Sequence, residues 1–495
     1  MEAIYGSLMQ ELDRNTQKRI KSISLMEDAG VKMAEIVMDY CKPKNVLLLL
    51  GSGGNAGDAL VLGRILLNNN INVSAYLFDE IKNNDAKVNY SLYKGNVLDD
   101  ISDLSSYDLI IDGIFGIGLK RELSNKYIDL IDKVNNSGIK IVSLDMPSGI
   151  DSSNGISYGA YIKCDLLITV EYLKVGLFLN DGINSFKDVK VINIGIDKTN
   201  DVINIITKND FKGIYDIRNR NTNKGSFGKA SIIAGSSKYP GASLLSYQAL
   251  ASFKMGVGFQ NLYVISSLYN MYALAHPEII TNKLSEIDGH IKYNETELDN
   301  IIKHSDSISI GMGMEVSIDL YNTIKYLLLN YDKTLIIDAD GINSLALYGK
   351  DILLNKKCNV ILTPHLKEFE RLSNIEISNI KKDPIYYAKD FAYKYGVILI
   401  LKSATSIITD GIKCMINISG NSGLAKAGSG DSLTGILTGN IAYFRKNDNF
   451  INACYSAYML GRIAELGAKK FEEEALTISD AITYIPDVIK EIKAL

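Results

Sequence analysis

The sequence predicts an α/β protein with two domains, each built on a parallel sheet that is covered by helices on both faces. Two observations predict this class. Short aliphatic runs end in loops that contain glycine or aspartate and then lead into amphipathic stretches, which is typical of strand–helix–strand units. The same pattern also starts again after residue 225, which indicates a second sheet.

Each expected strand is an uninterrupted apolar run, as in parallel sheets whose faces are both buried. The expected strands are 46–50, 109–112, 139–145, 166–170 and 189–196 in the first half, and 230–234, 307–310, 334–338, 359–362 and 397–402 in the second. A polar segment rich in Asn and Asp, 197–210, separates the two sets, so we divide the chain into domains 1–205 and 206–495. The tail, 476–495, is expected to form one terminal helix.

The composition is that of a soluble globular protein, with 46% hydrophobic and 22% charged residues among 495. The net charge is only −4 and no basic stripe is present, so we expect neither nucleic acid nor an anionic membrane as partner. No apolar run approaches the length of a membrane span. Five cysteines without CxxC spacing and four histidines favour neither a disulfide framework nor a metal cluster, and we expect a cytoplasmic location.

A glycine-rich loop, 51–58, follows the strand 46–50, and a helix is expected from Ala59. Small residues let backbone N–H groups approach an anion at a helix N-terminus. The loop also fits GxGxxA with Asp79 and Glu80 about 20 residues further on, the fingerprint of a dinucleotide-binding dehydrogenase. Asp58 weakens that interpretation because it places negative charge where a pyrophosphate needs positive potential. A plain helix N-cap is an alternative role for Asp58.

Three more strand ends, 112–122, 145–151 and 169–171, are expected at the same edge of the first sheet, where ligands bind in such folds. The oxygen atoms of Asn55, Asp112 and Ser148 are of the kind that hold a monovalent cation or Mg²⁺. Asp145 is a candidate general acid or base.

Together these segments resemble the N-terminal domain of the YjeF family, the NAD(P)HX epimerases, whose motifs are GxGNNGGDG, DAIFGTGL and DVPSGID. The counterparts are 51–59, 112–119 and 145–151, and the likeness covers nearly all of residues 1–205. The resemblance implies a Rossmann-like three-layer sandwich that interconverts the epimers of hydrated NADH and NADPH. It also implies that Asp145 is the acid/base and that Asn55, Asp112 and Ser148 bind K⁺. The substrate-binding residues it implies are Gly54, Asn55, Ala56, Gly57, Asp58, Gly116, Ile117, Gly118, Leu119, Lys120, Arg121, Glu122 and Asp145.

This first domain departs from the family pattern at three positions. Gly54 stands where the family has Asn, and Ala56 and Ala59 replace glycines. Because alanine does not readily adopt a positive φ, we expect a reshaped loop.

In the second domain a long glycine-rich segment, 417–431, precedes a helix expected from Ser432. The N–H groups of 428–430 would converge over the helix N-terminus, which suits a phosphoryl group in transfer. Asp431 beside them is placed to take a proton from an attacking hydroxyl. The alternative is a plain glycine-rich turn with an Asp in the first helical turn.

Other strand ends of the second domain carry polar residues suited to ligands. Lys402 opens the segment 402–406, which could clasp a nucleotide phosphate, although a lone lysine is more often a surface residue. His365 lies in 363–368 beside a proline at the sheet edge, where contact with a ligand is favoured over a purely structural role. The segment 338–341 ends a third strand.

This ordered set resembles the ribokinase-like fold, and more closely the ADP/ATP-dependent NAD(P)HX dehydratases. The family motifs KGTYGKVLIIAGS, GPGLG, DADALN, LTPHPGE, KSATTIVTDG and GNPGLATGGTGD correspond to 224–236, 311–315, 338–343, 362–368, 402–411 and 420–431. The resemblance spans about residues 205–495 and implies a ribokinase-like three-layer sandwich, Mg²⁺ with ADP or ATP as cosubstrate, and a homo-oligomer. The nucleotide-binding residues it implies are Lys402, Ser403, Ala404, Thr405, Ser406 and Gly430, and the NAD(P)HX-binding residues are Ala242, Gly313, His365 and Asp431.

The second domain also departs from its family pattern. Met312, Met314 and Glu315 replace Pro, Leu and Gly of GPGLG, and Ala427 replaces the first glycine of GGTGD. We expect a changed loop rigidity at Met312 and a weakened nucleotide affinity from the carboxylate of Glu315.

The two resemblances predict a bifunctional repair enzyme that epimerises NADHX and NADPHX and dehydrates the S epimer to NADH or NADPH at the expense of ADP or ATP. One alternative is a small-molecule kinase of the thiazole or pyrimidine type with an accessory domain. A second alternative is a catalytically inactive binding protein, given the altered glycines. The product separates the first two, because a kinase releases a phosphorylated substrate and a dehydratase releases NADH and phosphate.

Overall fold

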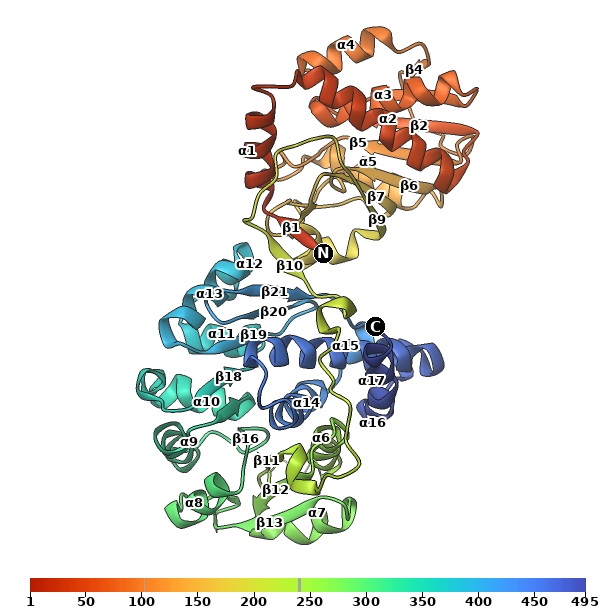
Figure 1. The fold of residues 1–495 in the computed structure, drawn as a ribbon. Helices are drawn as coiled ribbons and strands as arrows, with labels where there is room; N and C mark the ends of the chain where they lie inside the picture. The colour runs from red at the N-terminus through yellow and green to blue at the C-terminus, as the bar shows by residue number, and fades with distance from the viewer. Residues whose placement is uncertain (102, 239–241) are drawn as a thin grey trace. The chain divides into compact units, whose positions relative to one another are not determined.

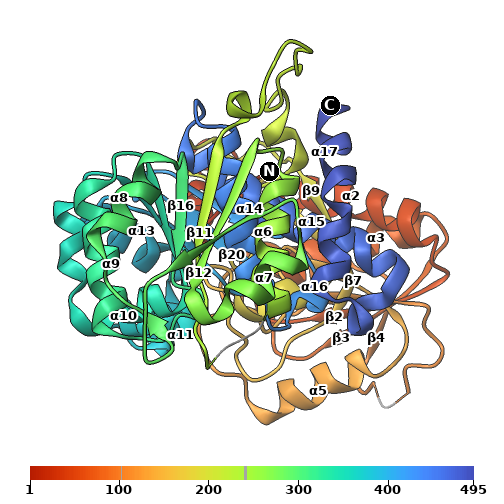
Figure 2. The same cartoon turned by 90° about the horizontal axis from the view of Figure 1, so that it is seen from below.

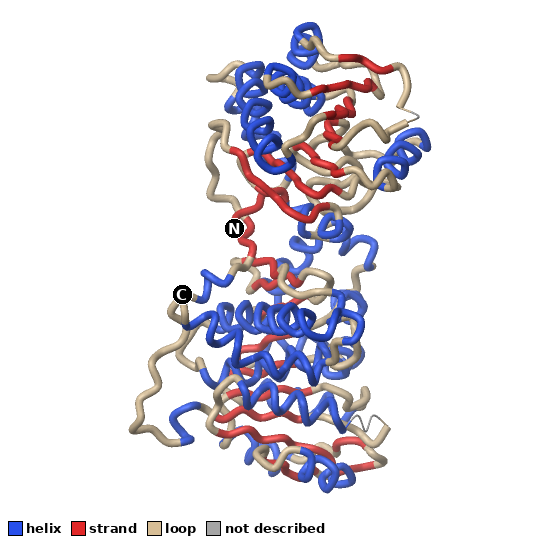
Figure 3. Tube along the Cα trace, turned by 90° about the vertical axis from the view of Figure 1, so that its right-hand side faces the viewer, coloured by secondary structure: helices blue, strands red, loops and turns tan. Residues whose placement is uncertain are grey.

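The computed structural model describes residues 1–101, 103–238 and 242–495, without the side chains of 242–247 and Ala275. The chain divides into two compact units, Glu2–Ile203 and Asn204–Leu495, with Met1 assigned to the second. Both units are α/β, as predicted, with strands lying between helices (Figure 3). No helix in the described part of the chain combines the length and apolarity needed to cross a membrane.

The first unit is built on a seven-stranded parallel sheet in the order β4-β3-β2-β5-β6-β7-β9. Its strands are β2 (Asn45–Leu50), β3 (Asn72–Leu77), β4 (Asn96–Leu98), β5 (Leu109–Gly113), β6 (Lys140–Leu144), β7 (Cys164–Val170) and β9 (Phe186–Ile192). A short strand, β1 (Glu2–Ile4), pairs in parallel with β8 (Leu173–Lys174). The central strands are buried aliphatic runs because helices cover both faces.

The helices of the first unit are α1 (Gly6–Thr16), α2 (Ser22–Cys41), α3 (Gly54–Asn68), α4 (Asn84–Leu92) and α5 (Asn125–Asn135). Helices α2, α3 and α4 pack against one another (Figure 1), and α5 connects β5 to β6. The strand order reverses between β2 and β5, since the chain runs outward through β3 and β4 before it returns to β5. Such a switch point opens a crevice at the carboxyl ends of the strands, where ligands bind.

The second unit has a larger sheet, whose strands follow the order β13-β12-β11-β16-β17-β18-β19-β20-β21-β10. They are β10 (Ile203–Ile205), β11 (Lys229–Ile233), β12 (Phe259–Ile265), β13 (Ile280–Leu284), β16 (Ser307–Ile310), β17 (Thr334–Ile337), β18 (Asn359–Leu362), β19 (Ile398–Leu401), β20 (Ser406–Thr409) and β21 (Cys414–Asn417). A separate hairpin joins β14 (Glu286–Ile287) and β15 (His290–Ile291). The sheet is parallel from β13 to β19, but β19, β20 and β21 pair antiparallel, which the apolar pattern did not predict.

The helices of the second unit form two groups on the two faces of its sheet (Figure 2). On one face lie α8 (Glu295–Lys303), α9 (Ile318–Asn330), α10 (Ala339–Tyr348), α11 (Leu366–Ser373), α12 (Ile377–Lys382) and α13 (Pro384–Tyr395). On the other lie α6 (Ala242–Lys254), α7 (Tyr269–Ala275), α14 (Ser429–Tyr443) and α15 (Asn449–Ala475). Helices α6 and α14 approach closely, since a Cβ at Gly435 or Gly439 would lie 2.3 Å from a backbone oxygen of Gln248 or Ser252. This close contact fixes the position of α14 beside α6.

The tail differs from the prediction of one terminal helix. It forms two short helices, α16 (Ile478–Ala481) and α17 (Ile485–Lys493), joined by a 3-10 turn. Pro486 lies in the first turn of α17. The helix breaks there because proline has no N–H to donate to the preceding turn.

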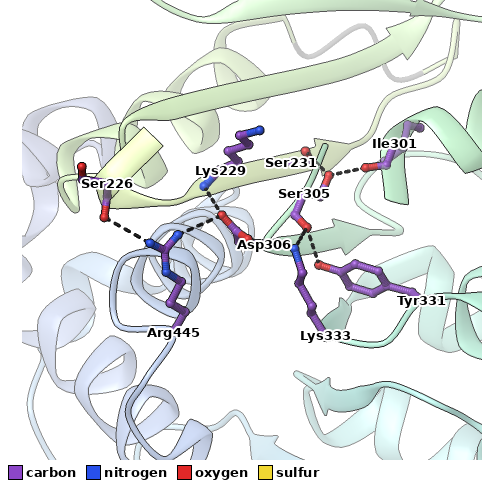
Figure 4. A network of polar contacts seen from close by, with 9 residues as sticks. All are labelled: Ser226, Lys229, Ser231, Ile301, Ser305, Asp306, Tyr331, Lys333 and Arg445. Atoms are coloured by element: carbon purple, nitrogen blue, oxygen red, sulfur yellow. Dashed lines mark hydrogen bonds and ion pairs between the residues drawn. The ribbon is translucent and has the colours of Figure 1, made fainter. Parts of the chain in front are cut away.

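A polar network ties together the amino-terminal ends of the strands in the second unit (Figure 4). The carboxylate of Asp306 accepts hydrogen bonds from the backbone N of Lys229 and from Lys333 Nζ, both at 2.9 Å, and lies 3.3 Å from Arg445. Burial alone raises the pKa of Asp306, but the hydrogen bond and charge of Lys333 outweigh it and hold the pKa below its usual value. Ligands bind at the opposite ends of parallel strands, so this network stabilises the fold.

Candidate active sites

The first candidate site lies at the switch point of the first unit. Helix α3 begins at Gly54, with Gly53 as its N-cap, and not at Ala59. Asn55 therefore lies in the first helical turn, and Asp58 lies further along the helix. The alternative role of Asp58 as the helix N-cap is wrong.

The substitutions of glycine by alanine at positions 56 and 59 fit this helix without strain. Neither residue has a positive φ, and both are fully buried. The methyl group of Ala59 is accommodated by Gly113 at the end of β5, where an added Cβ would lie only 2.8 Å away. The two alanines therefore cause no backbone strain in this loop, because a helical turn does not need glycine.

Asn55, Asp112 and Ser148 come together around the backbone of Phe115. Asn55 Nδ2 donates to the carbonyl of Phe115 at 3.0 Å, and the Phe115 N–H donates to Ser148 Oγ at 2.9 Å. Ser148 Oγ in turn donates to the buried carboxylate of Asp112 at 2.6 Å. Among the described atoms, Asn55 Oδ1 is buried without a hydrogen-bond partner. An oxygen in that condition is the kind of group that a cation satisfies.

The carboxylate of Asp112 is already well hydrogen-bonded behind this oxygen. Oδ2 accepts from Ser143 Oγ at 2.8 Å and from the Ser148 N–H at 2.9 Å, in addition to the bond at Oδ1. Burial raises the pKa of Asp112, while the hydrogen bonds from Ser148 and Ser143 oppose the rise. A cation at Asn55 Oδ1 would favour the ionised form further.

Asp145 follows β6 and has a positive φ of 62°, a strained conformation for a residue with a side chain. Its carboxylate is 15% exposed, and Oδ1 accepts a hydrogen bond of 2.5 Å from Lys174 Nζ, a fully buried ammonium. Oδ2 points toward Gly116, where an added Cβ would lie 3.6 Å away. The sequence argument did not include Lys174, although a lone lysine in the apolar run 173–179 was a visible signal.

The remaining predicted residues of this site lie in the loop after β5 and in α3. In the loop after β5, Leu119 is buried, Gly116 and Ile117 are partly exposed, and Gly118, Lys120, Arg121 and Glu122 are exposed. Gly57 is buried in α3 against Met26. Burial raises the pKa of Asp58 well above its usual value, and the charges of Asp145 and Asp13 add to the rise.

The convergence of strand ends predicted that Glu171, at the end of β7, would lie in this site, but its carboxylate contacts other residues. Its carboxylate pairs with Lys198 at 2.8 Å and accepts the Ile194 N–H at 2.9 Å. Asp79, which the dehydrogenase interpretation needs for a ribose, is 3.1 Å from Lys126 and hydrogen-bonded by Tyr127.

The second candidate site lies at the N-terminus of α14. The helix begins at Ser429, three residues before the predicted Ser432, and its N-cap Gly428 has a φ of 91°. Asp431 therefore lies in the first turn, and Ser429 Oγ is buried without a partner among the described atoms. Burial raises the pKa of Asp431 to about 6, with the charge of Asp338 adding and that of Lys402 opposing.

Lys402, at the end of β19, reaches the same point. Its Nζ donates to Asp338 Oδ1 at 2.9 Å and would lie 3.2 Å from a Cβ at Gly430. Asp338 is buried and its Oδ2 accepts from Thr434 Oγ1 of α14 at 2.6 Å. Burial lowers the pKa of Lys402, but the charges of Asp338 and Glu368 outweigh it and raise the pKa overall. Sequence reasoning quoted Asp338 only as a strand end and missed Thr434.

His365 is the N-cap of α11. Its Nδ1 accepts hydrogen bonds from the N–H groups of Lys367 and Glu368, at 3.1 and 3.2 Å. Burial lowers the pKa of His365, and the charge of Lys402 lowers it further. Nδ1 therefore carries no proton, and the proton of the neutral ring lies on Nε2, which is 3.5 Å from Glu368 Oε1.

The other predicted residues of the second site lie on loops or at the starts of β20 and α6. Ser403 and Ala404 are exposed, Thr405 is buried, and Ser406 begins β20. Gly313 has a φ of 61° between two buried methionines. Ala242 begins α6, and its side chain is outside the described part of the chain.

Glu315, which replaces a glycine of the family pattern, has partners for its carboxylate. Its carboxylate accepts from Ser236 Oγ at 3.1 Å and lies 3.5 Å from Lys238 Nζ.

Comparisons with known proteins match both units. Residues 230–487 match the family model for NAD(P)H-hydrate dehydratase, and residues 22–176 match the model for the YjeF-related protein N-terminus. The bifunctional NAD(P)H-hydrate repair enzyme Nnr of Dictyoglomus turgidum is 31% identical over 99% of both chains. The enzyme of the same name from Thermofilum pendens is 28% identical over 100% of this chain and 97% of its own. The chain belongs to the NAD(P)H-hydrate repair family.

A solved structure supports the fold of the second unit within this family. A hypothetical protein from Streptococcus mutans is 27% identical and superimposes with a TM-score of 0.51, covering 58% of this chain and 99% of its own. Family membership places an epimerase-type unit and a dehydratase-type unit on one chain. It decides for the bifunctional repair enzyme against the small-molecule kinase and against the dehydrogenase.

Proposed function

We propose that the first unit interconverts the R and S epimers of NADHX and NADPHX at Asp145, and that the second unit dehydrates the S epimer at Asp431 with ADP or ATP. One observation carries this proposal. In a chain of the repair family, each unit holds a partly buried aspartate near a lysine: Asp145 pairs with Lys174, and Asp431 lies in the field of the charge of Lys402. Each aspartate lies next to the start of a helix, α3 or α14.

The dehydratase reaction follows from the placement of Asp431. The hydroxyl oxygen of the S epimer attacks the terminal phosphorus of the nucleotide, an O–P bond forms, and the bond to the leaving nucleotide breaks. Asp431 accepts the hydroxyl proton, and with a pKa of about 6 it is ionised and basic at neutral pH. The lone pair of the ring nitrogen then expels inorganic phosphate, and loss of a proton from the adjacent carbon restores the double bond.

The same end of α14 supplies positive potential for the phosphates. The helix N-terminus, Lys402 and the Ser429 hydroxyl, which has no partner among the described atoms, all lie at this point. Among the described residues no group of three or more His, Cys, Asp or Glu side chains is arranged to hold a metal. We therefore assign Mg²⁺ to the nucleotide, whose phosphates supply ligands and whose charge the metal offsets.

The epimerase reaction needs proton transfer at the hydrated ring carbon. Asp145 gives a proton to the departing hydroxyl and takes one from the water that adds to the other face, so the atoms balance. Asn55 Oδ1, the Phe115 carbonyl and Ser148 Oγ fit K⁺, with the charge of Asp112 behind them. The cation supplies positive potential beside the substrate when bound.

The test supplies a mixture of NADHX epimers with ADP or ATP and follows the absorbance of restored dihydronicotinamide. The wild-type chain should consume the whole mixture. Asp145→Asn should consume only the S fraction and then stop, and Asp431→Asn should epimerise without producing NADH. Accumulation of a phosphorylated hydrate without NADH would contradict the dehydratase assignment. Loss of both activities in either variant would contradict separate sites.

A further inference from the structure

Lys174 is a fully buried lysine whose ammonium makes three hydrogen bonds inside the first unit. It donates to Asp145 Oδ1 at 2.5 Å, to Thr169 Oγ1 at 2.7 Å and to the Val170 carbonyl at 3.0 Å. Removing an ammonium from water carries a desolvation penalty, which only well-placed partners offset. Packing alone therefore does not explain a lysine at this position.

A neighbouring ion pair shows that the fold itself does not require a buried lysine. Asp145 and Glu171 end adjacent strands with similar backbones, φ of 62° and 58°, and each N–H donates at 2.7 Å to a carbonyl of the next strand. Glu171 pairs with Lys198, whose side chain is 72% exposed, whereas Lys174 is 0% exposed. The same strand-end geometry is thus compatible with an exposed lysine.

The two carboxylate oxygens of Asp145 have different surroundings, because Lys174 contacts only one of them. Oδ1 receives Lys174 Nζ and, at 3.3 Å, the Val170 N–H. Oδ2 is turned toward Gly116, the loop after β5 and the side chain of Asn55. Thr169 Oγ1 donates to the backbone carbonyl of Asp145 at 3.0 Å and accepts from Lys174, so it braces both partners.

We propose that Lys174 is the positioning residue of the epimerase site. It fixes Asp145 by Oδ1, presents Oδ2 to the hydrated ring, and offsets the cost of holding a negative charge in a site from which water is largely removed. This inference rests on the proposed epimerase function and adds to it a residue that does not touch the substrate. Without the ammonium, Asp145 Oδ1 would keep only the two longer hydrogen bonds of 3.3 Å, from Thr169 Oγ1 and the Val170 N–H, and its charge would be unpaired.

The test compares Lys174→Met with the control Lys198→Met in the full chain. Lys174→Met should lower the epimerase kcat about 100-fold, the loss typical of a misplaced acid/base, with a KM within about 3-fold of wild type. Lys198→Met should leave both constants within about 2-fold. The dehydratase activity of the same molecules on the S epimer should be unchanged, which checks the second unit.

Two further variants cover the case in which Lys174→Met fails to fold. Thr169→Val keeps the charge but removes the brace, and it should lower kcat about 10-fold with little change in KM. Lys174→Ala should regain epimerase activity when ethylammonium is added, and not with tetramethylammonium, which has no N–H to donate. A normal kcat in Lys174→Met, or in Thr169→Val, would overturn the positioning role alone. Absence of epimerisation by the wild-type chain would overturn the proposed function as well.

Discussion

We expect the negative charge of Asp431, which the dehydratase reaction needs, to lower the stability of the folded second unit. Burial raises the pKa of Asp431 from 3.8 to about 6. A carboxyl whose pKa is raised on folding binds its proton more tightly in the native state, so its ionisation opposes folding. The destabilisation is absent below pH 3.8, grows between pH 3.8 and about 6, and is complete above that range.

The size of the effect follows from the shift. A rise of roughly two pKa units, at about 1.36 kcal/mol each, gives ~3 kcal/mol as an upper limit, and solvent near the half-buried side chain reduces it to ~1–3 kcal/mol. Asp431→Asn removes this charge, so the variant should lose dehydratase activity and yet be more stable at pH 8. For a unit of this size we expect a rise in Tm of roughly 2–5 °C.

The assay is calorimetric unfolding of the full chain at pH 8 and at pH 5. At pH 5 roughly half of the gain should remain, because the native carboxyl is then mostly protonated. Asp332→Asn, at an exposed position, should change Tm little at either pH. A lower Tm for Asp431→Asn at pH 8, or an equal gain at both pH values, would refute the reasoning.

Two more predictions concern the charges around each site. The wild-type dehydratase kcat should rise with pH through about 6, as Asp431 ionises. Lys402→Met should shift that rise to higher pH by about one unit, because it removes the charge that opposes the increase in the pKa of Asp431. Profiles of kcat against pH at saturating nucleotide measure this shift, and an unmoved profile would argue against the role of Lys402. Asn55→Leu should abolish activation of the epimerase by K⁺, measured with KCl against choline chloride at equal ionic strength, whereas a retained K⁺ response would place the cation elsewhere.

Much of the fold was predictable from local pattern. The predicted strand 46–50 is β2, which begins one residue earlier. The predicted strands 307–310 and 359–362 are β16 and β18, with the predicted bounds. Such strands are recognisable because a parallel strand buried on both faces must be apolar throughout. The strands β20 and β21, which lie between β19 and β10 in the sheet, were missed because they form an antiparallel hairpin, whereas the pattern predicted strand–helix–strand units.

The sequence by itself determined the two parallel-sheet units and the loops that hold Asp145 and Asp431, because apolar runs and glycine-rich turns are properties of neighbouring residues. Only the tertiary structure decided which groups surround these carboxylates. Lys174 follows Asp145 by 29 residues, Lys402 follows Asp338 by 64, and Thr434 follows Asp338 by 96. Contacts over such separations depend on which strands lie side by side and on how closely helices approach the sheet. Burial, and with it the pKa of Asp431, arises from that packing, which no local pattern encodes.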